Sequence, residues 1–156
     1  MSLEPEFLAD CPYLAEGVLL DEIALVDRDQ SRVVARMPTH ADLPLTRTQR
    51  VHPKKHPRHI NGGLMVHMTG IVGFVHAYYV LDLRHADGWT GYGGSIKSAR
   101  YKALATVGPP IHIACQAARV RKGKERIIAQ YAFEFTQGDT VVYTSQQTAM
   151  FMRVIE

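Results

Sequence analysis

The segment from His59 to Leu83, HINGGLMVHMTGIVGFVHAYYVLDL, constrains the fold more than any other part of the chain. It is the longest apolar stretch, and its apolar side chains fall on every side of a helical wheel, which predicts a helix buried nearly all round and ending near residues 84–85. Small residues mark one helical face: Gly63, Gly70, Gly73 and Ala77. Because each glycine costs roughly 1 kcal/mol relative to alanine in a helix, packing must offset this cost. We expect a curved sheet wrapped around the helix.

Length and composition indicate the general class of protein. With 156 residues, 46% apolar and 21% charged, the chain is expected to form one domain over residues 1–156, with an N-terminal extension at 1–16. His67 and His76 interrupt the apolar segment, so no membrane span is expected. The acidic N-terminus lacks the features of a secretion signal. Two cysteines without metal-type spacing favour a reducing cytoplasm.

Charge is distributed unevenly along the chain. Nine of the fifteen acidic residues lie in residues 1–42, and none lies between residues 43 and 81. The basic residues just before the apolar segment are Arg47, Arg50, Lys54, Lys55 and Arg58. This pattern favours an anionic partner, although a solvated loop would have the same composition. Aromatic residues do not interleave with the basic ones, so nucleic-acid binding is not expected.

Strand patterns lie on both sides of the expected helix. Turn residues and alternating apolar positions predict strands over residues 17–27, 32–37, 111–121, 127–136 and 141–154. Four prolines in residues 38–61 predict a long irregular loop, and loops of that length are often functional. Helix and strands segregate along the chain, which predicts an α+β fold with an antiparallel sheet around one long central helix.

Two motifs resemble those of a known family. Residues 96–102, IKSARYK, with Gly108 beyond them, resemble the I-D-x-A-R-F-K segment and following glycine of 3-hydroxyacyl-ACP dehydratases. Residues 55–63, KHPRHINGG, are similar to the turn that precedes the helix in that family, and Asn61-Gly62-Gly63 looks like the H-G-G turn of acyl-CoA thioesterases. Both groups have the hotdog fold. The resemblance therefore implies that fold, with homodimers or larger assemblies of dimers joined through sheet edges.

The resemblance also implies a substrate class and an activity. The substrate would be an acyl thioester on CoA or on the phosphopantetheine arm of acyl carrier protein, with no further cofactor. The basic residues before the helix suit CoA phosphates or an acidic carrier protein. The implied enzyme is a dehydratase or enoyl hydratase, a lyase of fatty acid metabolism. An acyl-CoA thioesterase and a non-catalytic acyl-thioester-binding protein remain as alternatives.

The start of the helix is the expected substrate site. Unpaired amides there carry partial positive charge, which would polarise a thioester carbonyl at Gly63 and Leu64. The residues expected to bind substrate are His59, Asn61, Gly62, Gly63, Leu64 and Arg100. His56 matches the catalytic histidine of the dehydratases. The dehydratase carboxylate would fall at Met68 and the thioesterase acid at Gly70, so this sequence lacks both.

The missing carboxylate leaves histidine as the candidate base. His67 is the second expected catalytic residue, because a neutral imidazole accepts protons near neutral pH. Alternatively, it is a hydrogen-bonded core histidine, the role expected for His76. His52, His56, His59 and His67 have no recognised ligand spacing, so no metal is expected.

Overall fold

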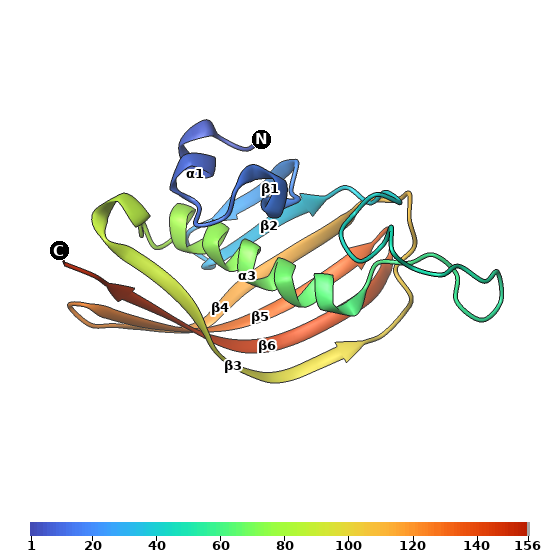
Figure 1. Cartoon of the computed structure of the whole chain (residues 1–156). Coiled ribbons are helices and arrows are strands. Elements are labelled where there is room, and N and C mark those ends of the chain that lie inside the picture. Colours follow the sequence, from blue (N-terminus) through green and yellow to red (C-terminus); the bar gives the residue numbers. More distant parts are fainter. Residues whose placement is uncertain (156) are drawn as a thin grey trace.

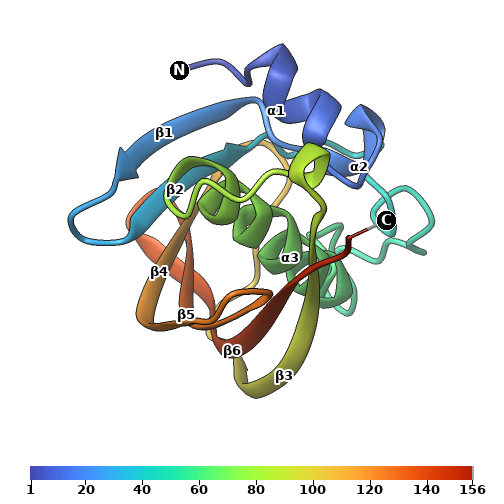
Figure 2. The same ribbon diagram turned by 90° about the vertical axis from the view of Figure 1, so that its left-hand side faces the viewer.

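The structure is a computed structural model that describes residues 1–155. A six-stranded antiparallel sheet has the order β1-β2-β4-β5-β6-β3. The elements in chain order are α1 (Pro5–Asp10), α2 (Ala15–Val18), β1 (Glu22–Asp27), β2 (Arg32–Met37), α3 (Gly62–Tyr79), the 3₁₀ turn η1 (His85–Asp87), β3 (Trp89–Tyr101), β4 (Ile111–Lys122), β5 (Arg126–Gln137) and β6 (Thr140–Arg153). The sheet curves around α3 (Figures 1 and 2). The predicted α+β architecture is therefore confirmed.

The sheet buries one face against α3 and leaves the other face open. In β5, Ile127, Ala129, Tyr131, Phe133 and Phe135 are buried, whereas the residues between them are more exposed. This alternation follows from the period of two along a strand, and the antiparallel register continues it across β4 and β6. The core consequently lies between the concave face of the sheet and the helix.

Helix α3 is buried as the sequence predicts but is shorter. Of its 18 residues, only Gly63 and Gly70 are exposed. The helix ends at Tyr79, and Asp82 then takes a left-handed conformation with φ of 55°. Apolar residues continue to Leu83, and for that reason the composition predicted a longer helix than the backbone forms.

The first predicted strand begins later than expected. Residues 15–18 form the short helix α2, and Leu19 has a φ of 58°, which turns the chain before β1 starts at Glu22. The prediction of a strand from residue 17 was wrong. The apolar residues Val18 and Leu20 are buried, but they pack from a helix and a turn.

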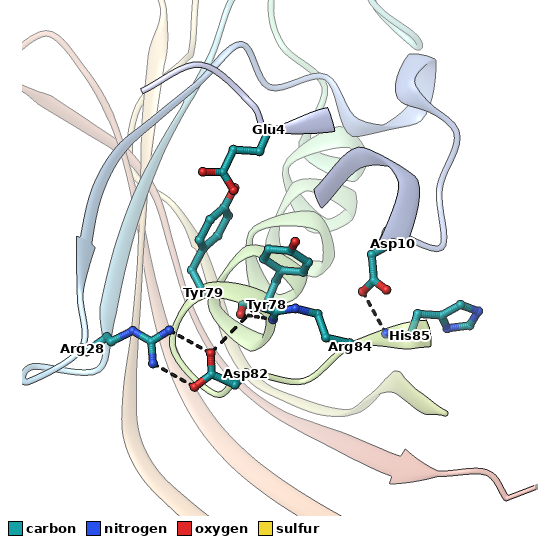
Figure 3. Close-up of polar contacts among 8 residues, drawn as sticks. All are labelled: Glu4, Asp10, Arg28, Tyr78, Tyr79, Asp82, Arg84 and His85. Atoms are coloured by element: carbon teal, nitrogen blue, oxygen red, sulfur yellow. Dashed lines mark hydrogen bonds and ion pairs between the residues drawn. The ribbon is translucent and has the colours of Figure 1, made fainter. Parts of the chain in front are cut away.

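The N-terminal segment is anchored at the far end of α3 (Figure 3). The Asp10 carboxylate accepts hydrogen bonds from the amides of His85 and Ala86, at 2.8 and 3.0 Å. The Tyr79 hydroxyl donates to Glu4 at 3.1 Å, and the desolvation of this tyrosine raises its pKa. These contacts hold α1 against α3, so residues 1–16 form part of the packed structure.

The two edges of the sheet differ. At the β1 edge, Met1 and Ser2 pair with Glu22 and Ile23, so the chain's own start covers part of that strand. At the other edge, the 13 residues of β3 pair only with β6 among the described strands. No helix in residues 1–155 is both long and apolar enough to span a membrane.

Candidate functional site

The turn before α3 is closed by its own cap. The Asn61 side chain accepts a hydrogen bond from the Gly63 amide at 2.7 Å, and the Leu64 amide donates to the Asn61 carbonyl at 3.1 Å. Asparagine is a preferred N-cap because it satisfies amides that the helix leaves unpaired. The amide of Gly63, expected to polarise a thioester carbonyl, is therefore already engaged in this structure.

Tyr101 covers the same turn from strand β3. Its hydroxyl donates to the Gly62 carbonyl at 3.1 Å, and a Cβ at Gly62 would lie 2.7 Å from its ring, so a larger residue there would require the Tyr101 side chain to move. Beside it runs an open groove of about 460 Å³, lined on one side by residues 101–105 and on the other by His59, Ile60, Gly62 and Met65. His59 and Gly62 both border this groove.

The loop histidines lie on the surface beyond the turn. His52 and His56 form a small antiparallel bridge, and His56 is exposed, with its ring centroid 4.9 Å from that of His59. Gln49 clamps the main chain of His59 by accepting from its amide at 3.1 Å and donating to its carbonyl at 2.8 Å. This clamp orients the chain that enters α3. No three metal-ligating side chains converge here or elsewhere in residues 1–155.

His67 turns toward the N-terminal segment. Its Nε2 lies 2.8 Å from the Gly17 carbonyl, and its ring packs edge-on against Tyr13 at 5.1 Å between centroids. The carbonyl can only accept, so Nε2 carries the proton and is occupied. The structure does not bring His67 together with His56, and its observed role is to hold residues 13–17 against α3.

Arg100 lies on the opposite face of the sheet from α3. It pairs with Thr144 in the register of β3 and β6, whereas its neighbour Tyr101 pairs with Tyr143 and faces the helix. Arg100, Lys97 and Lys102 border an open hollow on this outer face. Within residues 96–102, the segment that resembles the dehydratase motif, Tyr101 is the residue that reaches the turn before α3.

A second hollow, which residue patterns alone did not predict, lies midway along α3. This cavity of about 240 Å³ separates α3 from strands β3, β5 and β6. Its walls are largely aromatic: Tyr13, Phe74, Tyr92, Tyr131, Phe133 and Phe151. Gly70 and Gly73 form the helical side, and a Cβ at Gly70 would meet no atom within 4 Å. None of the residues that line it is aspartate, glutamate or histidine.

A hydrogen-bonded pair supplies the polar side of this cavity. Gln147 Nε2 donates to Thr69 Oγ1 at 2.8 Å and to Ser145 Oγ at 3.1 Å. The Thr69 hydroxyl donates to the Val66 carbonyl at 2.6 Å. The period of two along β6 places Gln147 on the same face as Ser145, and this was the signal available in the sequence. Its pairing with Thr69, 78 residues away, depends on the tertiary fold.

His76 forms a separate buried cluster. Its Nδ1 lies 2.8 Å from the Tyr131 hydroxyl, and its Nε2 lies 2.9 Å from Ser31 Oγ. Burial lowers the pKa of His76 from 6.5 to about 4, so the ring is neutral at pH 7. This geometry agrees with the structural role expected for this residue.

The architecture defines a class that solved structures share. Thioesterase HI1161 of Haemophilus influenzae is similar, with a TM-score of 0.60 and 18% identity over 94% of this chain and 87% of that chain. A dehydratase heterocomplex, ApeI:P of Xenorhabdus doucetiae, has a TM-score of 0.64 and 16% identity over 99% and 94%. The PaaI protein of the Escherichia coli phenylacetic acid degradation operon has a TM-score of 0.60 and 12% identity over 86% and 85%. The chain therefore has the hotdog fold, as the motifs implied.

No family model matches the sequence, and no curated protein matches it either. At identities of 12 to 18%, the structural similarity shows the fold. The choice of reaction and substrate must be argued from the geometry of this chain.

Proposed function

We propose that this chain is of the thioesterase type and binds acyl thioesters, with the acyl group in the cavity beside α3. The observation that carries this proposal is the cavity itself, with aromatic walls, a glycine side and one polar pair. Ligand sites are typically concave and mostly apolar, with few polar groups that fix orientation. Thioesterases among the structural neighbours support the proposal.

Position 70 limits the rate of hydrolysis in this proposal. Hydrolysis of a thioester benefits from a general base, which contributes roughly 10²- to 10⁴-fold. Here the residue at the position of the thioesterase acid is Gly70, with open space where a side chain would be. We therefore expect slow hydrolysis by the natural chain.

Basic side chains in the loop before α3 suit the carrier of the thioester. Arg47, Arg50, Lys54 and Lys55 are exposed in the loop before α3. This loop lies beyond the N-terminal end of α3 (Figure 1), where Gly62 begins the helix and borders the groove. Positive clusters concentrate anionic ligands. CoA phosphates or an acidic carrier protein are the proposed partners.

The open edge of β3 supports a homodimer in this proposal. Unpaired strand edges pair readily with another strand, and β3 exposes Tyr92, Ile96 and Tyr101 along its length, at 60%, 50% and 57% of their surfaces. A second copy at this edge would extend the sheet.

The substitution Gly70→Asp tests the function. With a panel of acyl-CoA substrates, we expect the variant to release thiol at least about tenfold faster than the natural chain, because a carboxylate can act as base from the open cavity. Gly70→Ala is the matched control and should leave the rate unchanged. Acyl-CoA binding without faster release in Gly70→Asp would support the non-catalytic alternative.

A dehydratase or enoyl hydratase is the second candidate, favoured by the segment at residues 96–102. Its test is hydration of enoyl-CoA, with His56→Ala as the variant. Hydration that survives His56→Ala would remove that residue from the mechanism.

A further inference from the structure

The orientation of the Gln147 amide follows from its neighbours. The Thr69 hydroxyl donates to the Val66 carbonyl, and the Ser145 hydroxyl donates to the Ser98 carbonyl at 2.8 Å. A hydroxyl has one hydrogen, so each of these oxygens can only accept from Gln147. The NH₂ group must therefore face Thr69 and Ser145, since the reverse orientation would set an acceptor against two oxygens that have no hydrogen to offer.

This arrangement leaves one polar atom free. Both amide hydrogens of Gln147 are used by Thr69 and Ser145, and no group in residues 1–155 donates to its Oε1. Thr69 and Gln147 both line the cavity, so the free oxygen is an acceptor in a largely aromatic hollow. This oxygen is not fully buried, so water reaches it, and a ligand donor in the cavity would take the place of that water.

We propose that Gln147 is a specificity-determining residue, whose Oε1 selects ligands with a hydrogen-bond donor over ligands of the same shape without one. Thr69 and Ser145 are positioning residues, because they hold the amide in this orientation. The expected ligand group is a neutral hydroxyl or N–H on a ring or short chain. A cavity of 150 Å³ accepts benzene, so the present 240 Å³ accommodates one substituted ring.

The inference deepens the proposed function by describing the acyl group, but its test needs no thioester. Three ring compounds of similar shape serve as probes. Phenol offers a hydrogen-bond donor, toluene offers neither a donor nor an acceptor, and anisole offers an acceptor alone. Their dissociation constants are measured by NMR titration of the whole chain, following the amides of Gly70 and Gly73. A failure of thioester hydrolysis would leave these measurements unaffected.

The decisive variant is Gln147→Met, which keeps the size of the side chain and removes the acceptor. We expect phenol to bind roughly tenfold more weakly to this variant, while toluene and anisole lose no affinity. Gln146→Met is the matched control, because Gln146 is exposed and pairs with Ser98 and Ala132 on the outer face of the same strand. It should change none of the three affinities.

A second variant keeps the test valid if Gln147→Met does not fold. Thr69→Val removes one of the two oxygens that hold the amide, so its orientation is less restricted and the preference for phenol over anisole should shrink. Equal weakening of phenol and toluene in Gln147→Met would overturn the proposal. The proposal would also be overturned if the natural chain preferred anisole to toluene, which would mean that the NH₂ group faces the cavity. It would be overturned as well if the natural chain bound none of the probes.

Discussion

His76 links a single side chain to the pH dependence of stability. Its ring is fully buried between Ser31 and Tyr131 and stays neutral, with a pKa lowered by burial from 6.5 to about 4. In the unfolded chain the same imidazole takes up a proton as pH falls below its ordinary value. The unfolded state therefore binds more protons between pH 6.5 and 4, and native stability falls across that window.

We expect His76 to contribute on the order of 3 kcal/mol to this loss, because its pKa is about 4 in the folded protein against an ordinary value of 6.5. The measurement is urea unfolding at a series of pH values, comparing the natural chain with His76→Gln. The variant should be less stable at pH 7 and lose less stability on acidification. His40→Gln, at an exposed position, is the control and should follow the natural chain. A variant with the same slope as the natural chain would show that the pH dependence arises elsewhere.

The role of a residue is easier to predict when its hydrogen-bond partner is close in the sequence, as a comparison of Asn61 with His67 shows. Asn61 before a glycine pair is a recognisable N-cap, and its cap hydrogen bond to Gly63 spans two residues. His67 had two open interpretations, because its hydrogen-bond partner, Gly17, lies 50 residues away. Periodicity shows which face of a helix a residue occupies, but it does not name the segment that covers this face.

Helix α3 depends at its start on the Asn61 cap. Asn61→Ala removes the side-chain acceptor of the Gly63 amide, and we expect a loss of about 1 kcal/mol in the free energy of unfolding. Asn61→Ser should retain most of the stability, because serine is also a good cap. Chemical denaturation of the three proteins checks this. Equal stability of Asn61→Ala and the natural chain would mean that water replaces the cap without loss.

Element boundaries show where composition misleads. The alternating strands 127–136 and 111–121 were predicted nearly as they occur, because one face is buried and the other is not. The start of β1 and the end of α3 were displaced, since left-handed residues at Leu19 and Asp82 interrupt apolar runs. A leucine or an aspartate in the sequence does not predict a left-handed backbone conformation as a glycine would. Bulges in β3 near Gly94 and Lys97 likewise change which residues face α3.

At the scale of the molecule, assembly through β3 is the prediction to test. We expect Ile96→Lys to shift the protein from dimer toward monomer in analytical ultracentrifugation, because a charge on an open edge opposes pairing. Ile96 exposes 50% of its surface on that strand. Leu25→Lys is the matched control on β1, at the edge that Met1 and Ser2 partly cover, and it should leave the dimer intact. A monomeric natural chain, or a dimer lost only in Leu25→Lys, would contradict the assignment of this interface.

The sequence by itself determined the buried helix, the alternating sheet around it and the hotdog fold that its motifs resemble. The helix and the alternating sheet follow from periodicity, which acts between residues close in the chain, whereas the hotdog fold was implied by the resemblance of two motifs. Only the tertiary structure decided the cavity beside α3 and its polar pair, because Thr69 and Gln147 meet across 78 residues. It also separated Tyr101 at the turn from Arg100 on the outer face. The physical reason is that a helix or strand fixes the direction of a side chain, whereas long-range packing selects what that side chain contacts.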